Sequence, residues 1–259
     1  MYDKWSVLVY ENPGIVSWSP SSHFYFWNEN TDMPDFDPSF SSPHVNILNA
    51  DEVYRAFVRT QTLLRIISGV RILSGGRRIR HCKELHFFEN GYYKKPRYNE
   101  DLDVFLEELT NPFDQEVVKE IRSKDVGRNP NMIEFIIDES IDDYIARDIL
   151  LWIALGEEDL LYFITNAYKI MDSIRADTEV DKKNSELVLS DDLIVAIKKM
   201  KKHFRYMNTY EGSGRLSRHG NTRDTGPSKK PSIDIIKQDL IEVVREWFKY
   251  RYFLKHKKQ

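Results

Sequence analysis

Three arginines and a histidine gather in one glycine-rich stretch of this sequence, residues 212–232. They are Arg215, Arg218, His219 and Arg223. A guanidinium binds phosphate oxygens bidentately and stays charged, a histidine transfers protons near neutral pH, and glycine lets the backbone approach a ligand closely. These are the groups that metal-independent cleavage of RNA needs. His219 would act on the 2′-hydroxyl or the leaving oxygen, and Arg215 or Arg218 would stabilise charge on the phosphorane.

Two helical patterns flank this stretch and decide where it must lie. Apolar residues at helical spacing predict one helix over about 186–203 and a final helix over about 232–254, with Ser232 as N-cap. Pro227 and Pro231 cannot extend the earlier helix. The loop must therefore fold back beside the N-terminus of the final helix, where backbone N–H groups and the helix dipole favour an anion.

A second basic segment, residues 65–97, carries nine basic and two acidic side chains. Basic side chains suit phosphates, and aromatic rings within or next to the segment, such as Tyr93 and Tyr98, can stack on bases. The alternative is a charged hairpin whose aromatic side chains are buried. The predicted nucleic-acid-binding residues of the two segments are Arg77, Arg78, Arg80, Lys94, Lys95 and Arg223.

Composition limits the remaining classes of function. The 259 residues are 41% hydrophobic and include no apolar run of the length that spans a bilayer, so we expect a folded protein without a membrane segment. The single cysteine, Cys82, cannot form an intrachain disulfide, and no signal peptide is visible, which fits a cytoplasmic setting. No cofactor motif is present, and the histidines lack metal-ligand spacing, so we expect neither a cofactor nor a metal.

The order of predicted elements indicates an α+β fold. A mixed strand and helix domain is expected over residues 1–138, followed by an all-α four-helix domain over 139–259. Expected strands cover 5–10, 23–27, 83–89 and 132–138, an expected loop covers 30–43, and expected helices cover 49–70, 101–109, 139–155, 159–174, 186–203 and 232–254. The net charge of −3 conceals a basic excess in residues 65–97 and 198–259, which predicts either an anionic partner or pairing with the acidic segments.

The C-terminal part resembles the HEPN superfamily. The resemblance rests on the order of "EEDLLYFITNAYKIMDSIRAD", "RYMNTYEGSGRLSRHGN", a proline-containing connection and "SIDIIKQDLIEVVREWFKYR", and it covers roughly residues 140–255. It implies a helical bundle, a dimer and, as in many HEPN proteins, an RNase of toxin–antitoxin or antiviral systems. The usual motif places four to six residues between its Arg and His, whereas three separate Arg215 from His219 and Arg218 adjoins His219.

The sequence leaves two functions open. One is an RNA- or nucleic-acid-associated protein of a stress or antiviral defence system, with metal-independent RNA cleavage by Arg215 or Arg218 and His219 as its possible activity. The other is a noncatalytic sensor or interaction protein whose helical domain only oligomerises and whose Arg and His side chains bond to protein groups. Aromatic residues all round the end of the final helix, from Trp247 to Phe253, predict a homodimer or a partner protein there.

Overall fold

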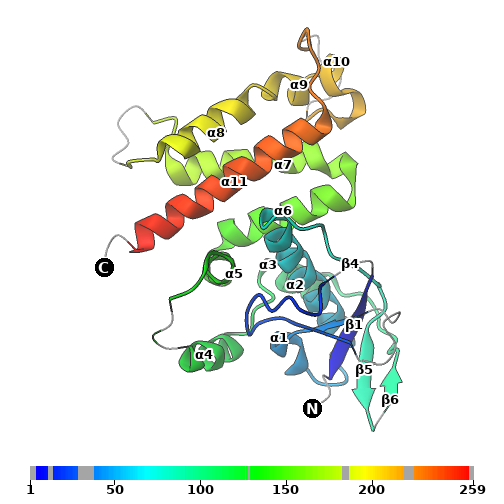
Figure 1. Cartoon of the computed structure of the whole chain (residues 1–259). Coiled ribbons are helices and arrows are strands. Elements are labelled where there is room, and N and C mark those ends of the chain that lie inside the picture. Colours follow the sequence, from blue (N-terminus) through cyan, green and yellow to red (C-terminus); the bar gives the residue numbers. More distant parts are fainter. Residues whose placement is uncertain are drawn as a thin grey trace. The chain divides into compact units, whose positions relative to one another are not determined.

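We describe a computed structural model of the chain, which divides into two compact units, Met1–Arg147 and Asp148–Gln259 (Figure 1). The boundary between the units falls inside helix α6 (Tyr144–Glu158). The structure describes residues 4–10, 14–28, 38–90, 92–125, 127, 129–182, 187–218 and 225–256. None of the described helices is both long enough and apolar enough to cross a lipid bilayer.

An antiparallel sheet in the first unit is built around β1 (Trp5–Tyr10). Trp5, Val7 and Val9 are buried, and Ser6 between the first two is buried as well, whereas Leu8 and Tyr10 are partly exposed, so the alternation of a half-buried strand holds over the second half of β1. One edge of β1 pairs with β3 (Ser39–Ser41) and the other with β5 (His86–Glu89) and β4 (Arg80–His81). β2 (Tyr25–Trp27) and β6 (Tyr92–Lys94) extend the sheet on either side.

The core of the first unit is the helix α2 (Val53–Leu73). Its residues are buried on nearly every side, including Leu63, Leu64, Ile66 and Ile67, as in a helix surrounded by other elements. It packs against β1 and against three helices. The surrounding helices of this unit are α1 (Pro43–Asn46), α3 (Leu102–Thr110), α4 (Gln115–Lys124) and α5 (Met132–Asp142).

The second unit is helical in its described residues. α11 (Ile233–His256) packs on α7 (Leu160–Thr178) and α8 (Asp191–Lys201), and the buried indole of Trp247 donates to Asp177 Oδ2 at 2.8 Å. As predicted, Ser232 caps α11, since its Oγ accepts from the Ile235 N–H at 3.2 Å. The remaining short helices are α9 (Phe204–Asn208), α10 (Tyr210–Ser213) and the 3₁₀ turn η1 (Gly214–Leu216).

The chain is thus mixed α and β, with a small antiparallel sheet near its start and a helical C-terminal region. The strand predicted over 132–138 was wrong, because this segment is the first part of α5. Asn131 and Glu134 form a reciprocal capping box that starts the helix. Its short apolar run, Phe135 to Ile137, is buried, and such a run does not distinguish a strand from a buried helix. The predicted domain boundary at 138/139 also falls within α5.

Two further segments differ from the sequence-based expectation. The loop predicted over 30–43 lies outside the described residues up to 37, but its end contains β3 and the start of α1. Strand pairing determines the position of β3. Ser42 as N-cap, followed by Pro43, determines the start of α1. The helix α4 was not predicted, although Asp114 caps it through two backbone N–H groups.

The end of α11 buries most of the aromatic residues on which the prediction of self-association rests. Trp247, Phe248 and Tyr250 lie in the core, whereas Phe253 is 52% exposed. The exposed apolar surface at this end is therefore smaller than the sequence suggests, and the dimer stays a prediction.

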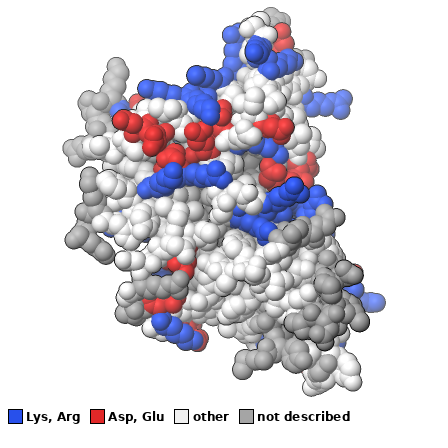
Figure 2. All heavy atoms as spheres, viewed as in Figure 1, with Lys and Arg blue, Asp and Glu red and all other residues white. Residues whose placement is uncertain are grey.

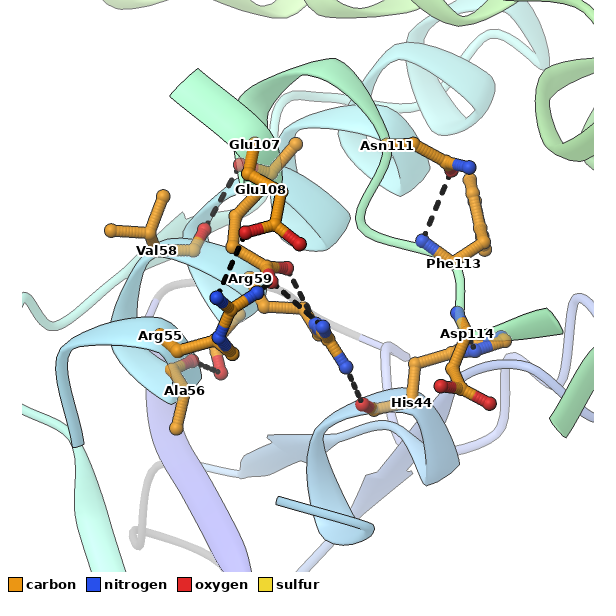
Figure 3. Close-up of polar contacts among 12 residues, drawn as sticks. His44, Arg55, Ala56, Val58, Arg59, Glu107, Glu108, Asn111, Phe113 and Asp114 are labelled. Atoms are coloured by element: carbon orange, nitrogen blue, oxygen red, sulfur yellow. Dashed lines mark hydrogen bonds and ion pairs between the residues drawn. The ribbon is translucent and has the colours of Figure 1, made fainter. Parts of the chain in front are cut away.

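A cluster of charged side chains holds α3 against α2 (Figure 3). The Glu108 carboxylate, 1% exposed, accepts from Arg59 Nε at 2.5 Å, from Arg59 Nη2 at 2.7 Å and from Arg55 Nη1 at 2.6 Å. The remaining Arg59 nitrogen, Nη1, donates to the backbone oxygen of His44 at 2.8 Å. Both carboxylate oxygens of Glu108 and all three guanidinium nitrogens of Arg59 are thus hydrogen-bonded. Buried charges are tolerated in proteins under this condition.

His44 continues this cluster toward the protein surface. Its Nδ1 accepts the backbone N–H of Asp114 at 3.0 Å, and its Nε2 lies 2.8 Å from Nδ1 of His23. Burial lowers the pKa of His23 to about 4 and that of His44 to about 3, so both rings are neutral at neutral pH. Because a backbone N–H can only donate, His44 carries its proton on Nε2 and donates it to His23, which then carries its own proton on Nε2.

Replacement of Glu108 tests the charged cluster. Glu108→Ala should lower the free energy of unfolding by about 3–5 kcal/mol, because Arg59 stays buried without a carboxylate. The matched control, Glu107→Ala, removes a 62% exposed partner of Arg55 and should cost less than about 1 kcal/mol. Urea unfolding followed by circular dichroism measures both. Equal losses of unfolding free energy in the two variants would show that the buried Glu108 contributes no more to stability than the exposed Glu107.

The histidine pair makes stability depend on pH. The folded pKa values of about 4 and about 3 lie below the ordinary 6.5, so the unfolded chain binds more protons as the pH falls below 6.5. The free energy of unfolding should therefore decrease by about 1.4 kcal/mol per pH unit for each histidine in this window. Unfolding of the wild type and of a His23→Gln/His44→Gln variant from about pH 7 to about pH 5 measures the difference in slope. If the free energy of unfolding changed with pH at the same rate in both proteins, the lowered pKa values of His23 and His44 would be contradicted.

Candidate functional site

The predicted catalytic loop is only partly described. Arg215 lies in η1 and is exposed, and Arg218 follows it, whereas His219 and Arg223 lie outside the described residues. Gly212 is packed against its own chain: a Cβ there would meet the Tyr206 backbone oxygen at 2.4 Å. The absence of a side chain at Gly212 therefore makes room for the backbone of Tyr206 rather than for a ligand.

Arg218 contacts protein groups of its own unit. Its guanidinium lies 4.6 Å from the ring centroid of Tyr168, and Nη2 lies 3.8 Å from Asp172 Oδ2. Its backbone N–H donates to the Met207 oxygen at 2.9 Å. Tyr168 is itself fixed, since its hydroxyl donates to the Phe204 oxygen at 2.9 Å and burial raises its pKa. The side chain is 41% exposed, so this anchoring is partial, but it is the arrangement expected of a structural arginine.

The basic residues of the second unit are widely paired with acids. Lys201 bonds to Asp181 at 2.8 Å, and Lys199 bonds to Asp239 at 2.9 Å. Figure 2 shows basic and acidic side chains next to one another over α8 and α11. Part of the positive charge of residues 198–256 is thus neutralised within the unit. This agrees with pairing between basic and acidic segments, which was the alternative to an anionic partner.

The basic segment of the first unit is spread over β4 and the β5–β6 hairpin. Arg77 and Arg80 are exposed and Arg78 is half-buried. In the hairpin, Lys94 pairs with Glu89 at 2.6 Å and Lys95 pairs with Glu84. The two lysines therefore fit the charged-hairpin alternative, and the arginines remain the candidates for phosphate contact.

An aromatic groove lies beside this segment, between α2 and α3. Tyr54 and Phe57 line the groove, and Tyr98 packs on both rings, its ring centroid 5.4 Å from that of Tyr54 and 5.0 Å from that of Phe57, so the three rings form one aromatic platform. The groove has a volume of about 570 Å³, and Leu102 and Phe105 of α3 form part of its wall. Large, apolar and open to solvent, it has the size of a small-molecule or nucleobase site.

Polar groups stand at defined places in this groove. Arg65 and Lys83 contribute positive charge to its lining, and Glu100 contributes one negative charge. Gln61 is buried, and no described residue pairs with its Nε2. A buried amide nitrogen without a partner costs free energy, and an acceptor on a bound ligand would remove that cost.

The charged cluster in Figure 3 is what forms the groove, because Arg55 and Arg59 of α2 bind Glu107 and Glu108 of α3. Tyr98, which directly follows the basic segment, was among the predicted stacking residues, whereas Tyr54, Phe57 and Gln61 were not predicted as functional residues. Their spacing at i, i+3 and i+7 puts them on one face of α2. Two aromatic residues and an amide on one face of the predicted helix were the available signal.

Comparisons with protein-family models, with curated proteins and with solved structures found no match to this chain. Within the ranges that the structure describes, no three His, Cys, Asp or Glu side chains converge as they would around a metal ion.

Arg218→Gln tests whether this arginine is structural. The variant should lose about 0.5–1 kcal/mol of unfolding free energy, because the contact with the Tyr168 ring is removed. Arg215→Gln, at an exposed neighbouring position, is the matched control and should change stability by less than about 0.5 kcal/mol. Thermal unfolding of both variants gives the comparison. If Arg218→Gln were as stable as the control, the Arg218 guanidinium would have no structural role and would be available to bind a ligand.

Proposed function

We propose that the chain is a noncatalytic nucleic-acid-binding protein, whose first unit holds single-stranded RNA with a base in the groove between α2 and α3. The observation that supports this most is the platform of three packed aromatic rings in a groove that also contains a buried, unpartnered amide. Single-stranded RNA is recognised through unstacked bases on aromatic side chains, with polar groups bonding to the base edges.

Each group of the groove has a role in this proposal. Stacking of a base on the Tyr98 platform contributes about 1–3 kcal/mol. The Gln61 amide bonds to the edge of that base, and Arg65 and Lys83 contact the adjoining phosphates. Lys83 belongs to the segment that also carries Arg77, Arg78 and Arg80, so the RNA backbone has further positive charge to follow.

The contacts of Arg218 with Tyr168 and Asp172 support a structural role for this arginine rather than a catalytic one. We therefore propose that the helical unit, which resembles HEPN domains, serves a sensor of a stress or antiviral defence system without cutting RNA. An assay for RNA cleavage separates the two functions. RNA incubated with the wild type should stay intact, whereas cleavage that disappears in His219→Ala would restore the ribonuclease hypothesis.

Binding of a labelled single-stranded RNA of about 12 nucleotides, followed by fluorescence anisotropy, tests the groove. Tyr98→Ala should weaken binding by about tenfold, because one stacking surface is lost. Phe253→Ala removes a similarly exposed ring from the second unit and should leave the affinity unchanged. If both variants bind as the wild type does, the groove is not the RNA site.

Salt dependence gives a second measurement on the same complex. Lys83→Gln should reduce the slope of log affinity against log salt by about 0.7, the value for one contact to a single strand. Lys119→Gln, on the exposed face of α4, should leave the slope as it is. A slope that is flat in the wild type would exclude phosphate contacts altogether.

A further inference from the structure

The groove between α2 and α3 contains a hydrogen-bond donor and a carboxylate acceptor beside its aromatic platform. The donor is Gln61 Nε2, which is buried and has no partner among the described residues. Gln61 lies one helical turn beyond Phe57, a member of the platform. The acceptor is Glu100, which lines the groove just before the start of α3. A base stacked on the platform therefore has polar groups within reach of its edges.

Glu100 and Gln61 approach the platform from different ends. Burial, followed by the negative charge of Glu100, raises the pKa of the Tyr54 and Tyr98 hydroxyls, so the carboxylate lies near both tyrosines. Tyr54 is in the first turn of α2, and Gln61 follows about 10 Å further along the helix axis. No described residue forms an ion pair or a hydrogen bond with the Glu100 carboxylate. A flat ligand on the platform thus meets the carboxylate at one end and the amide donor at the other.

This order of acceptor and donor discriminates among the four bases. The two oxygens of a carboxylate can accept from two neighbouring donors, and guanine alone has such a pair, N1–H and N2–H. Its opposite edge has the acceptors O6 and N7, which an amide N–H can reach. Adenine would turn its N1 acceptor toward the negative charge, as would cytosine its N3, and the single N–H of uracil lies between two carbonyl oxygens. The pyrimidines are also shorter than the separation of the two polar groups.

We infer that the groove is specific for guanine, with Glu100 accepting from N1–H and N2–H and Gln61 Nε2 donating to O6 or N7 while the ring stacks on the platform. This inference rests on the proposed function, since it takes the groove as the site of the base, and it adds the identity of that base. Bound guanine gives the buried amide nitrogen of Gln61 its missing acceptor. Two sources share this chemistry, a guanine within a single strand of RNA and a free guanine nucleoside.

Strands that differ in one base test the choice of base. Labelled single strands of about 12 uridines, with one central guanine, inosine or adenine, are compared by fluorescence anisotropy. The guanine strand should bind about tenfold more tightly than the inosine strand, because inosine lacks the N2 amino group that donates to Glu100. The adenine strand should bind more weakly than the inosine strand. Saturation-transfer NMR with guanosine and adenosine shows whether the free nucleoside binds as well.

Replacement of Glu100 tests the acceptor. Glu100→Gln should weaken binding of the guanine strand by about tenfold and bring its affinity close to that of the inosine strand, because the carboxylate that reads N2–H is lost. The matched control is Asp103→Asn, which removes an exposed charge on α3 close to the groove. Asp103 lies on a different face of α3 from Leu102 and Phe105, which line the groove. The control should keep the preference for guanine over inosine.

Replacement of Gln61 tests the donor and has a second readout. Gln61→Met keeps the length of the side chain but removes the amide, so it should weaken binding of the guanine strand by about tenfold. The thermal midpoint of the free protein should not fall, because an unpaired buried amide nitrogen is replaced by an apolar group. A lower midpoint together with unchanged affinity would show that Gln61 supports the fold rather than the base, and would overturn its role in the site.

The outcomes separate this inference from the proposed function. A preference for guanine that disappears in Glu100→Gln and persists in Asp103→Asn supports the inference, whether the guanine is in RNA or free. Equal affinity for the three strands, still weakened by Tyr98→Ala, would overturn the inference and leave RNA binding in the groove standing. Saturable binding of guanosine without binding of any strand would overturn the proposed function and leave the guanine site. Binding of neither strands nor guanosine would overturn both.

Discussion

Burial of the Glu108 carboxylate is the constraint on which the first unit depends. An isolated charge in this position would destabilise the fold strongly, so the two arginines of α2 must lie within bonding distance of it. Their positions fix where α3 lies against α2. The same requirement places the backbone oxygen of His44 on Arg59 and so fixes α1. One buried charge thereby determines the arrangement of three helices and the groove between two of them.

The two units satisfy their charged groups in different ways. The first buries a charged cluster and a neutral histidine pair, and the groove beside the charged cluster contains the unpaired amide nitrogen of Gln61. The second places its lysines on the surface beside acids and keeps an apolar core around Trp247. Surface ion pairs of this kind contribute little to stability or to recognition.

Local patterns predicted some elements and not others. The alternation in "WSVLVY" predicted β1, and the helical spacing up to Trp247 predicted α11, because each pattern has one buried face. The short apolar stretches of α5, interrupted by Glu134 and Asp138, carry no clear period, so the type of this element depended on the capping residues Asn131 and Glu134. The charged cluster was beyond prediction, since Arg59 and Glu108 are 49 residues apart and each looks like an ordinary solvated helix charge. The groove could not be found before that pairing was known.

The place of β1 in the sheet has a consequence for the synthesis of the protein on the ribosome. This strand precedes all its partners in the chain, yet it lies between β3 on one edge and β4 and β5 on the other. While residues up to His86 are still being translated, one of its edges has no partner and its apolar face has no complete core to cover it. Open edges of this kind pair with other chains. A growing chain of this protein is therefore exposed to aggregation until the β5 hairpin emerges, and chaperones that bind nascent apolar strands would act on its first half.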